Sequence, residues 1–318
     1  MGIVLIRQRP AIGDALLLAP LIREIKKEYP KQALTVLTDD TYMKGALPDI
    51  FQGISGVDRI ELVPMRRWTT GDNVREDHEL LGVDTVNVPL VVRKTDRLFN
   101  CNTAFIQHER AGGDQYGIAE FWLRHFNFWE DGTDCRPEYT VPGHAVEFVQ
   151  DWLKNDNKKV LGIVLRPGDP VRKWDFDDRA TTLMNWASDR GYHPVSIDSM
   201  FKTNSTRGQT WYGHSITYTA ALLKACSVVF TPDTGLLHLA EAVGTPTISL
   251  WGKVNPDLRV EGYRTMRLGI EGPRCAPEEK CPCCIEWSFQ HWGCVRKIGL
   301  QDMTNAIERC MEFVGVKV

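Results

Sequence analysis

The sequence lacks the long apolar runs and leader segments that direct proteins to membranes. No stretch approaches the ~18 apolar residues of a membrane-spanning helix. The first apolar segment, Ile3–Ile6, is too short for the hydrophobic region of a signal peptide, and no basic region precedes it. The chain also lacks the Ser or Thr at position 6 that N-myristoylation prefers. We therefore expect a cytoplasmic protein.

A strong excess of charge of either sign is also missing. Lys and Arg number 38 against 41 Asp and Glu, which gives a net charge of −3. Nucleic-acid-binding proteins usually present a basic surface, so nucleic acid is not expected as a partner. No Gly-x-Gly-x-x-Gly follows the strand predicted at Ile3–Ile6, which disfavours a dinucleotide-dependent dehydrogenase.

What is present is an alternation of strand and helix patterns over 318 residues, a length typical of about two domains. The first half begins strand–helix–strand, which predicts a parallel sheet. Its predicted elements are strands 3–6, 34–37, 59–63 and 83–88 and a helix at about 14–29, with 91–139 predicted as helix and loops. A second set has strands 160–165, 193–197, 228–231 and 247–251 and helices near 178–190, 217–224 and 300–314.

This order predicts an α/β fold of two Rossmann-like, doubly wound parallel-sheet domains that face a cleft. We place the domains at residues 1–155 and 156–318, because 150–159 is polar and a new strand follows it. Ligands are expected at the carboxyl ends of the strands.

The clearest local signal is the stretch 228–246, which reads as a buried strand, a tight turn and a short helix. Asp233 and Thr234 stand where a helix cap belongs, and Gly235 has no side chain to obstruct a ligand. Free N–H groups and the helix dipole favour a phosphate at such a corner, and His238 follows one turn later. The alternative is an ordinary β-turn-α corner with a capping Asp.

Three segments resemble the motifs of glycosyltransferase family 9, the ADP-heptose-type glycosyltransferases. Residues 7–23, with Gly13 and Asp14, resemble the opening motif of the family. Residues 232–252, which include Gly244-Thr245-Pro246 and Leu250-Trp251-Gly252, resemble its C-terminal signature. Arg166-Pro167-Gly168 followed by Lys173-Trp174 resembles its phosphate loop. The motifs lie in the order of the family.

The resemblance implies a GT-B fold and an inverting, metal-independent transfer that needs no cofactor. It assigns Asp14 as the general base for the acceptor hydroxyl, and the alternative is a carboxylate that only caps a helix. Arg7, Arg9 and Gly13 are the acceptor-side candidates. The loop that contains Arg9 is bulkier and more basic than in the family, which suggests a different acceptor.

Charge develops on the leaving diphosphate, so the donor site needs cations and N–H donors. The candidates are Arg166, Lys173, Asp233, Thr234, Gly235 and His238, and Asp198 is the candidate for a ribose hydroxyl because it ends a strand. Glu241, one turn after His238, either holds the imidazole or is solvated.

A cluster of five cysteines is the second sharp feature, at Cys275, Cys281, Cys283, Cys284 and Cys294. We predict that Cys275, Cys281, Cys284 and Cys294 surround one structural Zn or Fe ion, since four thiolates leave no open catalytic position. The cluster resembles the iron-binding finger of a family subgroup that heptosylates autotransporters. The alternative is reduced thiols packed as small hydrophobes. Cys101, Cys135, Cys226 and Cys310 are predicted to be isolated and buried.

These observations leave three hypotheses for function. The first is a glycosyltransferase that moves a sugar onto a saccharide or glycolipid such as a lipopolysaccharide core, with peripheral contact to a membrane surface; the expected sugar is heptose from ADP-heptose. The second keeps the fold and changes the acceptor to a protein or a modified nucleobase. The third is a non-catalytic nucleotide-sugar or metal-binding subunit, against which the presence of both Asp14 and Lys173 argues.

Overall fold

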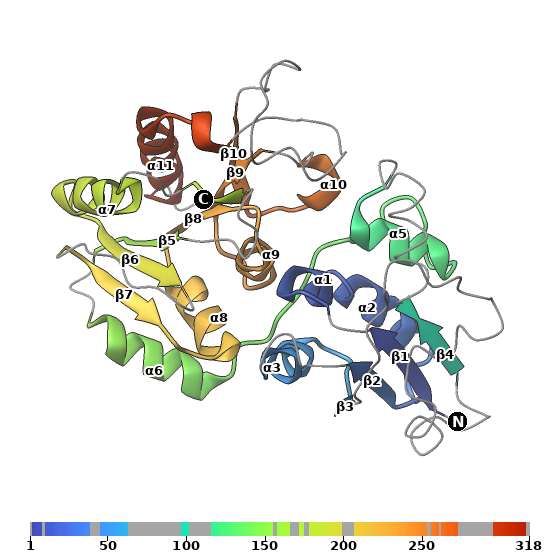
Figure 1. The fold of residues 1–318 in the computed structure, drawn as a ribbon. Coiled ribbons are helices and arrows are strands. Elements are labelled where there is room, and N and C mark those ends of the chain that lie inside the picture. Colours follow the sequence, from blue (N-terminus) through green and yellow to red (C-terminus); the bar gives the residue numbers. More distant parts are fainter. Residues whose placement is uncertain are drawn as a thin grey trace, which may run out of the picture. The chain divides into compact units, whose positions relative to one another are not determined.

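The computed structural model describes residues 2–7, 10–38, 45–62, 97–101, 116–154, 158–165, 172–174, 178–198, 207–252, 256–260, 262–272 and 295–315. These residues belong to two compact units, Met1–Thr140 and Val141–Val318 (Figure 1). None of the helices in the described ranges combines the length and apolarity that crossing a lipid bilayer requires.

The first unit contains a parallel sheet with the strand order β3-β2-β1-β4. Its strands are β1 (Ile3–Arg7), β2 (Leu34–Thr38), β3 (Arg59–Leu62) and β4 (Arg97–Asn100). Its described helices are α1 (Ile12–Leu16), α2 (Ala19–Glu28), α3 (Ala46–Gly53) and α5 (Ile118–His125). Strand β1 is buried at every position, as expected for the centre of a parallel sheet.

The single helix predicted at 14–29 is two helices in the structure. Helix α1 ends at Leu16, and α2 begins at Ala19 with Pro20 in its first turn. Proline has no N–H, and its ring clashes with the carbonyl four residues earlier, so a continuous helix cannot pass through this position.

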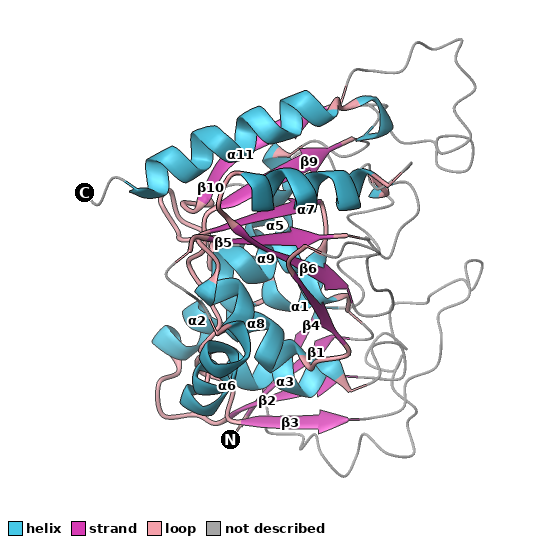
Figure 2. Ribbon diagram, turned by 90° about the vertical axis from the view of Figure 1, so that its left-hand side faces the viewer, coloured by secondary structure: helices cyan, strands magenta, loops and turns pink. Residues whose placement is uncertain are grey.

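The second unit contains a parallel sheet with the order β10-β9-β8-β5-β6-β7. Its strands are β5 (Val160–Val164), β6 (His193–Asp198), β7 (Gln209–Tyr212), β8 (Val228–Pro232), β9 (Thr247–Trp251) and β10 (Met266–Glu271). Its helices are α6 (Gly143–Leu153), α7 (Arg179–Asp189), α8 (Ile216–Ala225), α9 (Gly235–Ala242), α10 (Asp257–Val260), the 3₁₀ turn η5 (Val295–Lys297) and α11 (Leu300–Gly315). Figure 2 distinguishes strands from helices in both units.

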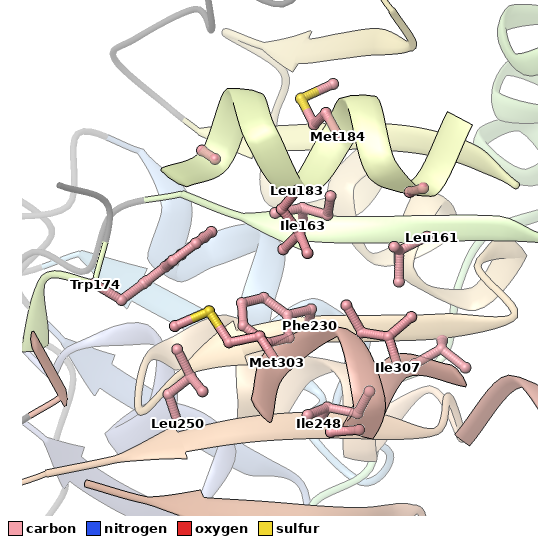
Figure 3. Packing of buried hydrophobic residues seen from close by; sticks show 14 of the residues in the cluster. Leu161, Ile163, Trp174, Leu183, Met184, Phe230, Ile248, Leu250, Met303 and Ile307 are labelled. Carbon is pink, nitrogen blue, oxygen red and sulfur yellow. The ribbon is translucent and has the colours of Figure 1, made fainter. Parts of the chain in front are cut away.

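Helices α7 and α11 cover one face of this sheet. Alternate residues of the strands, such as Leu161 and Ile163 of β5, meet Leu183 of α7 and Ile307 of α11 in one apolar cluster (Figure 3). The intervening residue Gly162 faces the other way, because a Cβ built on it would lie 3.0 Å from the Cys226 sulfur. Both faces of β5 are therefore covered.

The division between the units falls after Thr140, earlier than the predicted boundary at 155. The reason is α6, which packs on α8 of the second unit. Aromatic side chains attach α6 to this unit: the Phe148 ring lies 4.9 Å from that of Tyr218 in α8, and the Trp152 ring lies 4.8 Å from that of Trp211 in β7.

Strands β4, β7 and β10 and helices α3, α5, α6 and α10 were not predicted individually from the sequence, and β4 and α5 lie in the segment predicted as helix and loops. The strand predicted at 83–88 lies outside the described residues. Cys101, Cys135, Cys226 and Cys310, which were predicted to be isolated and buried, are all buried. Burial raises the pKa of Cys101 to about 12, which makes this thiol a poor nucleophile.

Candidate functional site

The chain reverses its direction across the second sheet between β5 and β8. From β5 it runs outward to β6 and β7, and it then returns to β8 on the opposite side of β5. Open parallel sheets bind ligands outside the carboxyl ends of the strands at such a switch point. The loop after β5 and the turn after β8 border this point, and both carry predicted donor-site residues.

Trp174 anchors the loop after β5. Its side chain is fully buried, and its indole Nε1 donates a hydrogen bond to the carbonyl oxygen of Val164 at 2.9 Å. Its ring stands edge-on to that of Phe230 in β8, with the centroids 5.1 Å apart (Figure 3). Because Trp174 is fixed at the end of β5, the preceding Arg172 and Lys173 are held at the switch point.

Arg172 ties this loop to the turn after β8. Its Nη1 donates to the backbone oxygen of Asp233 at 3.0 Å and lies 3.4 Å from the Asp233 carboxylate. The Asp233 side chain is 7% exposed and that of Arg172 31% exposed, so the arginine remains partly open to solvent. Arg166 and Lys173 were predicted as donor-site residues of this loop, and Arg172 was not, although it stands directly beside Lys173.

Helix α9 begins at this corner with Thr234, not Asp233, as its N-cap residue. The alternative of a capping Asp is therefore wrong, because the Asp233 side chain is engaged by Arg172. The Thr234 side chain makes no capping bond, and its hydroxyl lies 3.2 Å from that of Thr231. Gly235 opens the helix, so the first turn presents its backbone N–H groups without a side-chain cap from Thr234.

His238 and Glu241 are both buried on α9. The Nδ1 atom of His238 hydrogen-bonds the Tyr263 hydroxyl. Glu241 is not solvated as one alternative held: its two oxygens accept the backbone N–H groups of Arg264 and Thr265, each at 2.9 Å. Tyr263 was not found from the sequence, since it lies in an irregular segment that carries no motif.

Asp198 ends β6, the strand next to β5, and its side chain is buried. It therefore lies at the same edge of the sheet as the Trp174 loop, one strand farther from the switch point. This is the position at which an acidic residue accepts ribose hydroxyls in nucleotide-binding sheets of this order.

The first unit has its own switch point between β1 and β4, and Arg7 and Asp14 lie there. Arg7 ends β1, is buried, and donates from Nη1 to the backbone oxygen of Cys101 just after β4, at 3.4 Å. Its Nη2 lies 3.9 Å from Oδ2 of Asp14, and its guanidinium carbon lies 5.8 Å from the centre of the Trp122 ring. Trp122 was not selected from the sequence.

Asp14 occupies the third position of α1, where its Oδ2 also accepts the N–H of Ala11 at 3.4 Å. The bond is long, and the Asp14 side chain remains 29% exposed. Asp14 thus has a capping contact and an accessible carboxylate together. Gly13, beside it in α1, is buried.

Several predicted residues lie outside the described residues: Arg9, Arg166, Cys275, Cys281, Cys284 and Cys294. Within the described ranges, no group of three His, Cys, Asp or Glu side chains is arranged to hold a metal ion. The four-cysteine metal site stays a prediction.

Comparison with protein-family models matches residues 214–282 to glycosyltransferase family 9 (heptosyltransferase). This range includes the α9 corner, His238 and Tyr263. Comparison of the sequence with curated proteins gives no match.

Solved structures resemble the chain over nearly its whole length. A glycosyl transferase family 9 protein from Veillonella parvula has a TM-score of 0.71 at 15% identity, with 98% of this chain and 97% of that chain covered. The ADP-heptose lps heptosyltransferase II of E. coli has a TM-score of 0.68 at 14% identity, with 99% and 100% covered. The iron-containing dodecameric glycosyltransferase TibC from enterotoxigenic E. coli has a TM-score of 0.56 at 13% identity, with 99% and 78% covered. The predicted family resemblance and the two-sheet GT-B fold are thus confirmed.

Proposed function

We propose, on the premise that this chain is a glycosyltransferase of the family 9 type with a GT-B fold, that it transfers heptose from ADP-heptose to a saccharide acceptor with inversion. The observation that carries the proposal is the corner between β5 and β8. There Arg172, Lys173 and the start of α9 gather positive charge and N–H donors at the ligand-binding edge of a nucleotide-binding type of sheet.

In the proposed reaction, an acceptor hydroxyl oxygen attacks the anomeric carbon as the bond from that carbon to the diphosphate oxygen breaks. A single displacement inverts the anomeric configuration. The departing nucleoside diphosphate takes the electron pair of the broken bond, and Arg172, Lys173 and the first-turn N–H groups of α9 stabilise its charge. These cations do the work that a bound metal ion does in other transferases, so the proposal requires no metal.

The proton of the acceptor hydroxyl passes to Asp14. Its carboxylate has the exposure that contact with a substrate requires, and Arg7 lies on one side of it. Arg7 is fixed by the Cys101 carbonyl and by Trp122, so it holds the orientation of Asp14 in the first unit. Asp198 is proposed to accept ribose hydroxyls of the donor. The acceptor is proposed to be a glycolipid core, met by a cytoplasmic protein at a membrane surface.

A transfer assay tests the proposal. The purified protein is incubated with ADP-heptose and with other nucleotide sugars, and products on oligosaccharide, protein and nucleobase acceptors are identified by mass. We expect heptosyl transfer to a saccharide only. Transfer to a protein or a nucleobase, or transfer of a different sugar, would replace this proposal with the corresponding alternative.

The Asp14→Asn variant tests the assignment of the base. Its turnover is expected to fall by roughly 10²–10⁴-fold, because the proton acceptor is lost, while the affinity for ADP stays within about twofold. Asp49→Asn is the matched control, since Asp49 is also an acidic residue in the first turn of a helix of the same unit. Wild-type turnover in Asp14→Asn would end the assignment.

A further inference from the structure

A buried carboxylate holds the loop before β10 against α9. Glu241 is 6% exposed, and its oxygens accept the N–H of Arg264, the N–H of Thr265 and the Thr265 hydroxyl. A carboxylate that is removed from water is stable only when its oxygens are bonded. The loop at 263–265 therefore cannot leave α9 without exposing this carboxylate or leaving it unbonded.

The loop held by Glu241 carries Tyr263 to His238. The Tyr263 hydroxyl bonds Nδ1 of the imidazole, and the two rings stand nearly perpendicular, at 88°, with their centroids 5.8 Å apart. Tyr263 also packs against a small apolar cluster of Leu237, Trp251 and Val260. Its ring is fixed by packing, so its hydroxyl is fixed as well.

We propose that Tyr263 and Glu241 are positioning residues that set the tautomer of His238. Tyr263 donates its hydroxyl proton to Nδ1, so the neutral imidazole carries its own proton on Nε2, and Glu241 keeps Tyr263 in place. This inference rests on the proposed function, because a proton on Nε2 makes His238 a hydrogen-bond donor for the donor diphosphate. The other tautomer would direct a lone pair at an anion.

The direction of the hydrogen bond follows from acidity. A phenol loses its proton near pH 10, whereas a neutral imidazole N–H is a far weaker acid. Donation from the Tyr263 oxygen to the bare Nδ1 is therefore favoured over the reverse. Once Nδ1 is an acceptor, a neutral ring must hold its proton on Nε2.

Nitrogen chemical shifts of the histidine rings test the tautomer without any ligand. In ¹⁵N-labelled wild-type protein above the pH at which His238 titrates, the Nε2-protonated form is expected alone. Tyr263→Phe removes only the hydroxyl and keeps the ring packing, and it is expected to give a mixture of the two forms. A wild-type His238 that is protonated at Nδ1, or a variant spectrum identical to the wild type, would overturn the inference.

ADP affinity provides the second readout. Above the titration of His238, Tyr263→Phe is expected to weaken ADP binding about three- to tenfold, the size of one ordinary hydrogen bond. Below it, both ring nitrogens carry protons, so the penalty is expected to vanish. A double variant with His238→Gln is expected to bind ADP as weakly as His238→Gln alone. A penalty that persists at low pH, or that adds to that of His238→Gln, would show that the Tyr263 hydroxyl affects ADP binding by a route other than the tautomer of His238, and would overturn the inference.

Glu241→Gln tests the holding contact. A carboxamide cannot accept at both ends, so the loop loosens and the pH-dependent loss of ADP affinity is expected to match that of Tyr263→Phe. Glu308→Gln is the matched control. Glu308 lies on α11 and pairs with Arg190 at the end of α7, away from α9. Equal effects of the two Glu variants would overturn the role of Glu241. If the wild-type protein does not bind ADP, the donor assignment fails, and the tautomer measurement still decides the role of Tyr263.

Discussion

The Trp174→Phe substitution tests how the fold holds the proposed donor site. Trp174 belongs to the apolar cluster of the second unit, yet it directly follows the cations Arg172 and Lys173. Its indole N–H and its ring fix the loop to β5 and β8. Phenylalanine keeps an aromatic ring at this position and removes the anchoring hydrogen bond.

Two contributions set the expected loss of stability. Removal of the indole N–H costs about 1 kcal/mol, and somewhat more if the Val164 oxygen is left without a replacement. The smaller ring leaves roughly 40 Å³ unfilled, which at ~24 cal/mol per Å³ adds about 1 kcal/mol. We expect the free energy of unfolding to fall by about 2–3 kcal/mol, measured by urea denaturation.

The same substitution is expected to weaken ADP binding about tenfold, although Trp174 is not proposed to touch the nucleotide. The physical reason is that Arg172 and Lys173 lose their fixed position, so the ligand must order them on binding. Calorimetry in native conditions measures this effect separately from stability. Trp186→Phe is the matched control, because Trp186 packs on the same cluster from α7 and lies outside the loop.

An unchanged ADP affinity in Trp174→Phe, together with the expected loss of stability, would refute the reasoning. The loop would then hold its cations without the indole anchor. A loss of affinity in both Trp variants would also refute it, because the effect would be a general consequence of a weaker core.

Three further outcomes are expected. Arg172→Ala should weaken ADP binding by about 1–3 kcal/mol in calorimetry, through loss of a charge-assisted bond, and unchanged affinity would move the donor diphosphate elsewhere. A hydrogen bond from Arg136 lowers the pKa of Asp134 from 3.8 to about 2. Because the pKa of Asp134 is lower in the folded than in the unfolded protein, the ionised carboxylate stabilises the fold above about pH 4, and this stabilisation is lost as the pH falls toward 2. Asp134→Asn should therefore reduce the dependence of the unfolding free energy on pH in this range, measured by denaturation at several pH values. An unaltered pH dependence would contradict the shift. Chelation should raise protease sensitivity in the segment 275–294 if its cysteines hold a metal, and less than about a tenth of an equivalent of Zn and Fe by elemental analysis would leave only packed thiols.

The central strands could be predicted from the sequence because their apolar composition indicates that they are buried. Residues 160–164 and 228–230 are apolar without alternation, which is what a strand covered on both faces requires. The edge strand β7 has the sequence Gln209–Tyr212, with polar residues and one exposed tyrosine, and it carried no such signal. It forms because β6 offers an open edge for pairing, which is a tertiary effect.

The site could be predicted only as far as local chemistry determines it. Thr234 and Gly235 follow a strand and begin a helix, so their role in the turn could be predicted from the local sequence. The partners Arg172 and Tyr263 depend on contacts across 61 and 25 residues of chain, which no local pattern encodes. Asp233 shows the consequence: its sequence position suggested a helix cap, whereas in the structure Arg172, 61 residues earlier, lies 3.4 Å from its carboxylate.

Asp14 likewise has a local capping contact and a contact with a residue of another element, Arg7 of β1. A carboxylate at the third position of a helix satisfies a backbone N–H, and this alone would account for an aspartate there. At Asp14 the capping bond is long, a buried arginine stands 3.9 Å away, and the side chain stays accessible. A buried guanidinium needs partners, and the Cys101 oxygen and the Asp14 carboxylate provide two of them for Arg7. The helix cap therefore accounts for only part of what surrounds Asp14, and the turnover of Asp14→Asn tests the proposal that its carboxylate also contacts a substrate.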